Sequence, residues 1–236
     1  MNILLNDPMN YQDWTKENNE YLQRIENNSQ IQDFWNSYYS ENKDFKKEDI
    51  QICKNIIPSK ILEIISEFSK NALWKYNYKV STNELQYYQY ENIKYEEIKK
   101  FSVDLYHNIY FKHLFYEILL PNLNIENKEK ITIDRIFMSG RLHGLSDFLH
   151  KDDRSSEKIG PSIYIFLNDN WKCYYDGSLL LLPNIKNYTN TIHIEHELGK
   201  IVMFPPNLNH KFCEISGYGL LENVFSKVLE YHLIYI

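Results

Sequence analysis

The chain has few of the residues that cross-link a fold or that break helices and strands. Its 236 residues include only 3 cysteines, 7 prolines and 7 glycines. The cysteines, Cys53, Cys173 and Cys213, are odd in number and do not fall at paired spacings. This pattern argues against a disulfide framework and favours a reducing compartment, so we expect a cytoplasmic protein.

Basic runs and long apolar runs are also missing. The formal net charge is −6, and an acidic chain without a basic patch is not expected to bind nucleic acid. No apolar run approaches the ~20 residues that a membrane-spanning helix needs. The first eight residues lack the basic region and apolar core of a signal peptide. We therefore expect neither nucleic acid nor a membrane as a partner, and the sequence does not indicate the oligomeric state.

What the chain does have is enough apolar material for a core. Hydrophobic residues make up 43% of the sequence, and 20 of the aromatic residues are tyrosines. This composition is too apolar for a disordered chain. There are no internal repeats and no low-complexity linker, so we expect residues 1–236 to form a single domain.

The first half of the chain has mainly helical patterns. Pro58 is followed by apolar residues at helical spacing, which predicts a helix. We interpret residues 1–130 as mainly helical support for a core, with the aromatic-rich residues 84–118 as a possible lid. The predicted helices are 11–27, 29–40, 58–68 and one or two within 95–121, and short strands are predicted at 51–57 and 73–80.

From Ile131 onward, short apolar runs alternate with Gly, Asn, Asp and Pro. Many short strands with regular turn signals are typical of a jelly roll or barrel. Helices first and strands later favour an α+β fold, here a jelly-roll core in residues 131–236 supported by N-terminal helices. The predicted strands are 131–138, 147–152, 162–168, 178–183, 191–196, 200–204, 209–215 and 223–234.

One short motif suggests chemistry. His150 and Asp152 are two residues apart in a predicted strand, so both side chains face the same side. A second histidine, His210, lies near another predicted strand. Two histidines and one carboxylate with open coordination positions suit a non-haem Fe(II) site that activates oxygen. We predict that these three residues are the metal ligands and the catalytic centre.

The motif alone is not specific. His193 and Glu195 form a second pair with the same spacing, and Asp169, Asp176 and Glu197 are other carboxylates in this half of the chain. We expect His143, His193 and His196 to be surface or packing histidines.

The order of the surrounding motifs is more informative. After His150 come Tyr164, Leu167-Asn168 and Trp171, then Asp176-Gly177-Ser178 before an apolar strand, then Gly199 to Pro205, and finally His210. In this order and spacing, residues 131–236 resemble the 2-oxoglutarate/Fe(II)-dependent dioxygenase superfamily, in particular its prolyl-4-hydroxylase-like branch. The chain departs from the family in having Asp-Gly-Ser where Gly-Gly-Glu is usual.

The resemblance implies a double-stranded β-helix and an enzyme that uses Fe(II), 2-oxoglutarate and O2, with ascorbate as an optional reductant. It implies hydroxylation of an unactivated C–H in a peptidyl proline or a small molecule, with release of succinate and CO2. It also implies a basic anchor for 2-oxoglutarate on the last strand. No arginine follows Arg154, so Lys227 is the expected anchor, with Tyr164 as a second cosubstrate contact and Lys211 as a less favourable rival.

Two other functions fit the sequence less well. A cupin-like metalloenzyme that does not use 2-oxoglutarate usually has more histidines in its site. A degenerate, metal-free binding module would not need His150, Asp152 and His210 all intact. Arg135, on the first predicted core strand, is expected at the surface rather than in a pocket.

Overall fold

The computed structural model describes residues 47–78, 99–144, 149–152, 158–183 and 190–236. The chain divides into Met1–Asp44 and Phe45–Ile236, and every described residue belongs to the second unit. The helices predicted at 11–27 and 29–40 lie outside the described residues. The first part of the possible lid, residues 84–98, also lies outside them. The single-domain prediction for the whole chain therefore stays a prediction.

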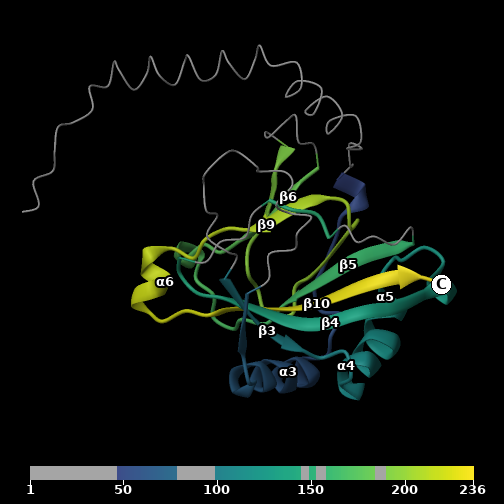
Figure 1. Ribbon diagram of the computed structural model, residues 1–236, viewed down its shortest axis with the longest axis horizontal. Coiled ribbons are helices and arrows are strands. Elements are labelled where there is room, and N and C mark those ends of the chain that lie inside the picture. Colours follow the sequence, from purple (N-terminus) through teal and green to yellow (C-terminus); the bar gives the residue numbers. More distant parts are fainter. Residues whose placement is uncertain (1–46, 79–98, 145–148, 153–157, 184–189) are drawn as a thin grey trace, which may run out of the picture. The chain divides into compact units, whose positions relative to one another are not determined.

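A large antiparallel sheet forms most of the described unit. Its strand order is β1-β8-β5-β10-β4-β3-β2. The last strand in the sequence, β10, therefore pairs with both β5 and β4 near the middle of the sheet (Figure 1). The bounds are β1 (Gln51–Cys53), β2 (Lys75–Tyr78), β3 (Lys99–Asp104), β4 (Ile131–Arg141), β5 (Ile159–Phe166), β8 (Ile201–Phe204) and β10 (Ser226–Tyr235).

A smaller sheet faces one side of the large one. It contains β7 (Ile192–Ile194), β6 (Leu179–Leu182) and β9 (Asn209–Phe212), in that order. Beside β9, residues 149–152 form no regular strand, but His150 makes an isolated antiparallel bridge to His210. Two facing antiparallel sheets with this connectivity confirm the predicted α+β fold with a jelly-roll core.

Both faces of the large sheet are buried. Side chains alternate between these two faces along each strand. On β5, Ile163 and Ile165 belong to one apolar cluster, whereas Tyr164 and Phe166 belong to another. The first cluster packs against the helices α3 (Ser59–Asn71) and α4 (Ile109–His113). The second lies between the two sheets and is called the interior here. Figure 1 shows α3 and α4 on the side of the sheet away from β6 and β9.

Helix α3 forms where the sequence predicted one. The Pro58 carbonyl accepts the first helical hydrogen bonds, from the amides of Ile61 and Leu62, each at 3.0 Å. The buried residues Leu62, Ile65 and Ser69 recur at helical spacing, so one face packs on the sheet. The remaining helical segments are short: η1 (Lys47–Asp49), the π-helix η3 (Leu114–Leu119), α5 (Leu120–Asn122), η4 (Lys128–Lys130), η5 (Cys173–Tyr175) and α6 (Gly217–Leu221).

Besides residues 149–152, which were predicted to form part of a strand, two other segments differ from the sequence prediction. Residues 99–104, predicted as part of a helix, form β3, which pairs with β4 and with β2. Helical propensity in this segment is overridden by the sheet partners on both sides. The final predicted strand, 223–234, begins later, at Ser226, and continues to Tyr235 as β10.

A glycine on β4 allows an aromatic cluster to attach β2 and β3 to the core. A Cβ on Gly140 would lie 2.1 Å from the ring of Phe225, so only glycine fits beneath that ring. The Phe225 ring meets Trp74 and Phe101 edge-to-face, with centroids 4.9 and 5.6 Å away. This cluster joins β3 and the residue before β2 to the segment before β10.

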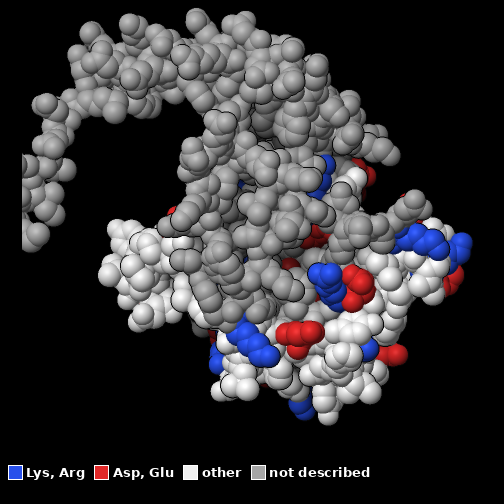
Figure 2. Space-filling view, viewed as in Figure 1, with Lys and Arg blue, Asp and Glu red and all other residues white. Residues whose placement is uncertain are grey.

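The described residues carry charged side chains of both signs on their surface. Figure 2 shows Lys and Arg side chains interspersed with Asp and Glu among the described residues of that face, without one large basic area. Within the described ranges, the structure contains no helix that is both long and apolar enough to span a bilayer.

Candidate metal centre

Backbone pairing brings the three predicted ligands together from distant parts of the chain. The amide of His150 donates to the carbonyl of His210 at 3.0 Å, and the amide of His210 donates back to His150 at 2.8 Å. The amide of Asp152 donates to the carbonyl of Pro206 at 2.8 Å. These bonds align residues 149–152 with β9, so that both histidines and the carboxylate share one side.

The side-chain geometry fits a single metal ion. One ligand atom from each of His150, Asp152 and His210 lies within 4.8 Å of the other two. The Nε2 atom of His210 is 3.6 Å from Oδ1 of Asp152, and the two imidazole centroids are 4.4 Å apart. Adjacent ligands held ~2.1 Å from one ion would lie ~3.0 Å apart, so binding requires only a small contraction. Two imidazoles and one carboxylate form the donor set typical of non-haem Fe(II).

The hydrogen bonds of His210 prepare it as a ligand. Its Nδ1 lies 2.9 Å from the carbonyl oxygen of Leu208, which can only accept, so Nδ1 carries the proton. The other nitrogen, Nε2, is then an acceptor and lies 3.1 Å from the hydroxyl of Tyr164. His210 is fully buried, so its ring orientation is fixed by packing as well as by this bond. A carbonyl partner of this kind sets the tautomer of metal-binding histidines.

Two hydroxyl groups on β5 orient the carboxylate of Asp152. The hydroxyl of Ser162 donates to Oδ2 at 2.5 Å, and that of Tyr164 donates to the same oxygen at 3.4 Å. The other oxygen, Oδ1, faces His210. The carboxylate is thus held with one oxygen directed at the predicted ion position. The predicted site residue Tyr164 therefore lies in contact with two of the three ligands.

Lys227 does not lie where the sequence prediction needs it. It has the same strand parity as Leu229 and Tyr231, which pack in the helix-facing cluster, so it faces away from the ligands. Burial lowers the pKa of its ammonium group, and the nearby carboxylate of Asp169 opposes that shift. Lys70, on α3, is another charge close enough to act on it. Lys227 as the 2-oxoglutarate anchor therefore stays a prediction, and its position on the helix-facing side of β10 does not favour it.

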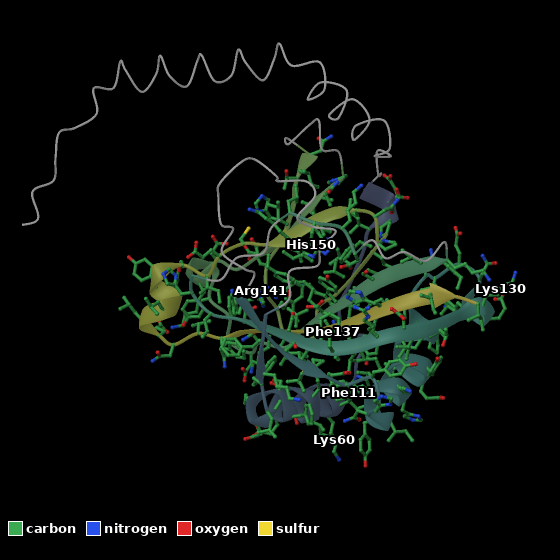
Figure 3. All side chains as sticks on the ribbon, viewed as in Figure 1. Lys60, Phe111, Lys130, Phe137, Arg141 and His150 are labelled. Atoms are coloured by element: carbon green, nitrogen blue, oxygen red, sulfur yellow. The ribbon has the colours of Figure 1, made fainter. Side chains whose placement is uncertain are left out.

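A cation that the sequence analysis missed faces the interior instead. Arg141, the last residue of β4, has the parity of Phe137 and Ser139 and is only 3% exposed. Its guanidinium carbon lies 3.8 Å from the ring centroid of Phe212, two residues beyond His210 on β9. Figure 3 shows Arg141 and His150 on the same side of β4, with Phe111 on the other. The sequence did contain a signal for this orientation, because Arg141 is two residues from Ser139 and four from Phe137. The strand was predicted to end before Arg141, so this spacing was not applied to it.

The other histidines in this half of the chain have different surroundings. In the competing pair, His193 is exposed on β7, and Glu195 is exposed just after that strand. His196 is buried, stacks on Trp171 with centroids 4.2 Å apart, and contacts the carbonyl of Gly177 at 3.0 Å. Burial lowers the pKa of His196 to about 3, so it is a neutral packing residue at pH 7.

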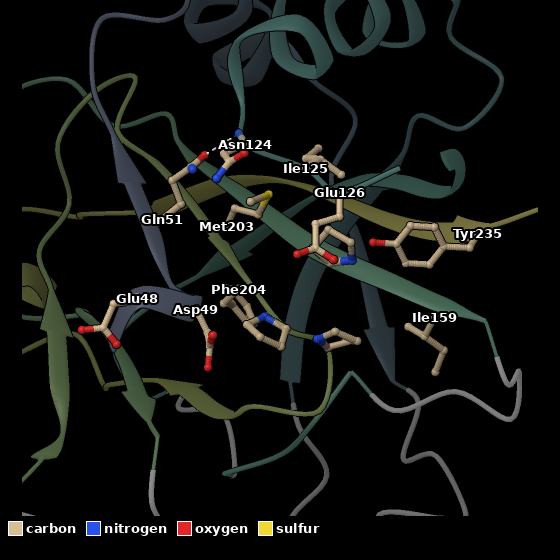
Figure 4. Close-up of a pocket in the computed structure, with 13 residues that line it drawn as sticks. Glu48, Asp49, Gln51, Asn124, Ile125, Glu126, Ile159, Met203, Phe204 and Tyr235 are labelled. Atoms are coloured by element: carbon tan, nitrogen blue, oxygen red, sulfur yellow. Dashed lines mark hydrogen bonds between the residues drawn. The ribbon is translucent and has the colours of Figure 1, made fainter. Parts of the chain in front are cut away.

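A separate cavity of about 330 Å³ lies at the edge of the large sheet, near β1 and β8. Figure 4 shows Glu48 and Asp49 on one side of it and Glu126 and Tyr235 on another. The three predicted metal ligands do not line this cavity. Its wall includes Pro206, whose carbonyl accepts the amide of Asp152, so the two sites share one loop.

Comparison with known proteins identifies the fold. No protein-family model and no curated protein sequence matches the chain. Among solved structures, a 2OG-Fe(II) oxygenase family oxidoreductase from Burkholderia pseudomallei has a TM-score of 0.56 at 9% identity, covering 80% of this chain and 86% of that one. A Trichoplax adhaerens prolyl hydroxylase in complex with a hypoxia inducible factor peptide fragment has a TM-score of 0.55 at 12% identity, covering 80% and 84%.

A third similar structure is EvdO2 from Micromonospora carbonacea, complexed with 2-oxoglutarate. Its TM-score is 0.54 at 9% identity, covering 80% of this chain and 86% of that one. At these identities the likeness shows the fold. The described unit therefore has the double-stranded β-helix fold of the 2-oxoglutarate/Fe(II) oxygenases, as the sequence resemblance implied.

Proposed function

We propose that the chain is an Fe(II)- and 2-oxoglutarate-dependent dioxygenase that hydroxylates an unactivated C–H group. The observation that carries this proposal is the convergence of His150, Asp152 and His210, with the partners of His210 and Asp152 already in place. The bound ion, 2-oxoglutarate and O2 supply the oxidising chemistry, with succinate and CO2 as the expected products. The protein supplies placement and electrostatics.

Each residue near the ion has a distinct part in that placement. The two imidazoles and the carboxylate of Asp152 would hold the metal and leave coordination positions open for other ligands. Ser162 fixes the carboxylate, and the Leu208 carbonyl fixes the tautomer of His210. Tyr164, whose hydroxyl contacts both His210 and Asp152, is positioned to donate to a cosubstrate oxygen once a metal ion occupies the lone pair of His210.

Arg141 replaces Lys227 as the proposed anchor for the far carboxylate of 2-oxoglutarate. It is buried on the interior face, and a guanidinium can bind a carboxylate through two parallel hydrogen bonds. The two cations make a matched test. Arg141→Gln should weaken 2-oxoglutarate binding at least tenfold without changing metal affinity, whereas Lys227→Met should leave both unchanged. The opposite pattern would return the anchor to Lys227.

The proposed primary substrate is a peptidyl proline or a small molecule. The peptide option is supported by the fold likeness to a prolyl hydroxylase whose structure contains a peptide fragment. Ascorbate is proposed only as an optional reductant. A cupin-like metalloenzyme is less favoured because, among the described residues, the metal-type cluster has two histidines and one carboxylate and no further histidine.

An anaerobic titration tests the proposal directly. Protein loaded with Fe(II) is titrated with 2-oxoglutarate, and a weak visible charge-transfer band is expected as the oxo acid chelates the ion. Admission of O2 should then give succinate in amounts that depend on both Fe(II) and 2-oxoglutarate. Absence of the band in protein that binds Fe(II) would reject a 2-oxoglutarate-dependent function in favour of another metalloenzyme.

A further inference from the structure

The interior holds a buried carboxylate close to the proposed anchor. Glu230 is 2% exposed and has the same strand parity as Val228, which belongs to the interior cluster. It pairs across β10 and β5 with Tyr164, and across β10 and β4 with Phe137. A carboxylate at this position is unexpected in a pocket that must bind a dicarboxylic acid, because like charges oppose each other strongly where water is excluded.

One hydroxyl links this carboxylate to the anchor. The hydroxyl of Ser139 donates a short hydrogen bond to Oε1 of Glu230 and lies 3.2 Å from a guanidinium nitrogen of Arg141, from which it accepts. The Glu230 carboxylate and the Arg141 guanidinium therefore bind the same oxygen atom. Glu230 thus occupies the kind of position near Arg141 that the far carboxylate of 2-oxoglutarate would need.

A buried histidine, His232, lies near the other oxygen of the Glu230 carboxylate but beyond hydrogen-bond distance. Oε2 of Glu230 is 3.6 Å from Nε2 of His232, two residues along β10 and paired with Ser162. Among the described residues, neither ring nitrogen of His232 has a hydrogen-bond partner, although the side chain is only 9% exposed. An unpartnered buried imidazole is costly, and it offers a hydrogen-bonding position to a group that moves toward it.

We propose that Glu230 is a specificity-determining residue of the cosubstrate pocket, which competes with the far carboxylate of a dicarboxylic 2-oxo acid for the Ser139–Arg141 site. This inference rests on the proposed function. Binding of 2-oxoglutarate displaces the Glu230 carboxylate from Ser139 toward His232, which then gains its missing partner. The displacement opposes binding, so the chain binds 2-oxoglutarate more weakly than its anchor alone would allow. A monocarboxylic 2-oxo acid, which has no far carboxylate, is not subject to this competition.

Calorimetric titration of the Mn(II)-loaded full chain tests the proposal without turnover. The probes are 2-oxoglutarate and 2-oxopentanoate, which has the same chain length but no far carboxylate. Glu230→Gln keeps a hydrogen-bond acceptor for Ser139 and removes the charge. It should tighten 2-oxoglutarate binding about tenfold or more, the order expected when a like charge is removed from a buried site, and change 2-oxopentanoate binding less than twofold. The control Glu195→Gln, at an exposed position just after β7, should change neither.

A second variant covers the case in which Glu230→Gln does not fold. Ser139→Ala removes the hydroxyl that holds Glu230 beside Arg141, and it should also tighten 2-oxoglutarate binding, severalfold. Unchanged or weaker 2-oxoglutarate binding in the folded variants, or equal tightening of both oxo acids, would overturn this inference alone. If the wild type and the variants bind Mn(II) but no 2-oxo acid, the proposed function fails and takes this inference with it.

Discussion

Removal of the predicted ligand Asp152 should abolish the stabilisation of the native state by a metal ion. A second acid in the chain, Glu195, provides a control. In Asp152→Ala the carboxylate that faces His210 at 3.6 Å is lost, and only two imidazoles remain. Glu195→Ala also removes a carboxylate, but one from the exposed His193–Glu195 pair at β7 and the residue after it. The two acids share the same spacing from a histidine and differ in whether a third ligand lies nearby.

The magnitude follows from linkage between binding and folding. A metal ion present at about one hundred times its Kd stabilises the native state by about 2.7 kcal/mol. For a folded unit of about 150–250 residues, that corresponds to a rise in Tm of about 5–11 °C. Wild type and Glu195→Ala should both show this rise with Fe(II), whereas Asp152→Ala should show less than about 2 °C under the same conditions.

The assay is scanning calorimetry of each protein under anaerobic conditions, with and without Fe(II). Tm values without metal serve as the baseline, so that a change in intrinsic stability is not mistaken for a change in metal binding. A full Fe(II) shift in Asp152→Ala would refute the site described here. Loss of the shift in Glu195→Ala would place the ion at the competing pair instead.

Three further predictions address the support of the site and of the fold. Ser162→Ala removes the hydroxyl that orients the ligand carboxylate and should weaken Fe(II) binding about 10–100-fold, measured by competition with a chelator; an unchanged Kd would remove this role. Gly140→Ala places a Cβ 2.1 Å from a phenyl ring and should cost about 1–3 kcal/mol in chemical denaturation, whereas Gly217→Ala, with nothing within 4 Å, should cost far less. The pKa of His196 is lowered to about 3, so below pH 6.5 the unfolded chain binds a proton that the native state does not. The stability advantage of wild type over His196→Gln should therefore shrink as the pH falls from 6.5 toward 4, and a constant difference would contradict the burial argument.

The fold could be predicted largely from local patterns. Apolar runs and turn residues located β5, β6, β8 and β9 to within a few residues, because each strand carries its own period and is bounded by its own breakers. The segment 99–104 could not be recognised in this way. Its identity as β3 depends on pairing with β4, thirty residues later in the sequence, and that information is not local.

The candidate site also has one part that the sequence could predict and one part that it could not. His150, Asp152 and His210 are brought together as the motif spacing and the resemblance predicted, and that they bind iron remains a proposal. The proposed anchor, Arg141, is not found by scanning the last strand for a basic residue, because strand parity decides which face a side chain occupies. Lys227 is one residue away from a position on β10 that would face the interior, so it lies on the helix-facing side. Arg141 faces the interior from the neighbouring strand, β4.

The place of β10 in the sheet has a consequence for biosynthesis. This strand follows all the others in sequence, yet it pairs with β4 on one side and β5 on the other. Until residues after 225 have left the ribosome, β4 and β5 have no neighbour to join them, and two unpaired strand edges are open to chaperones or to other nascent chains. The two sheets therefore cannot close around the candidate metal centre before β10 has been made, and pairing between strands so far apart in the sequence is expected to make folding slow.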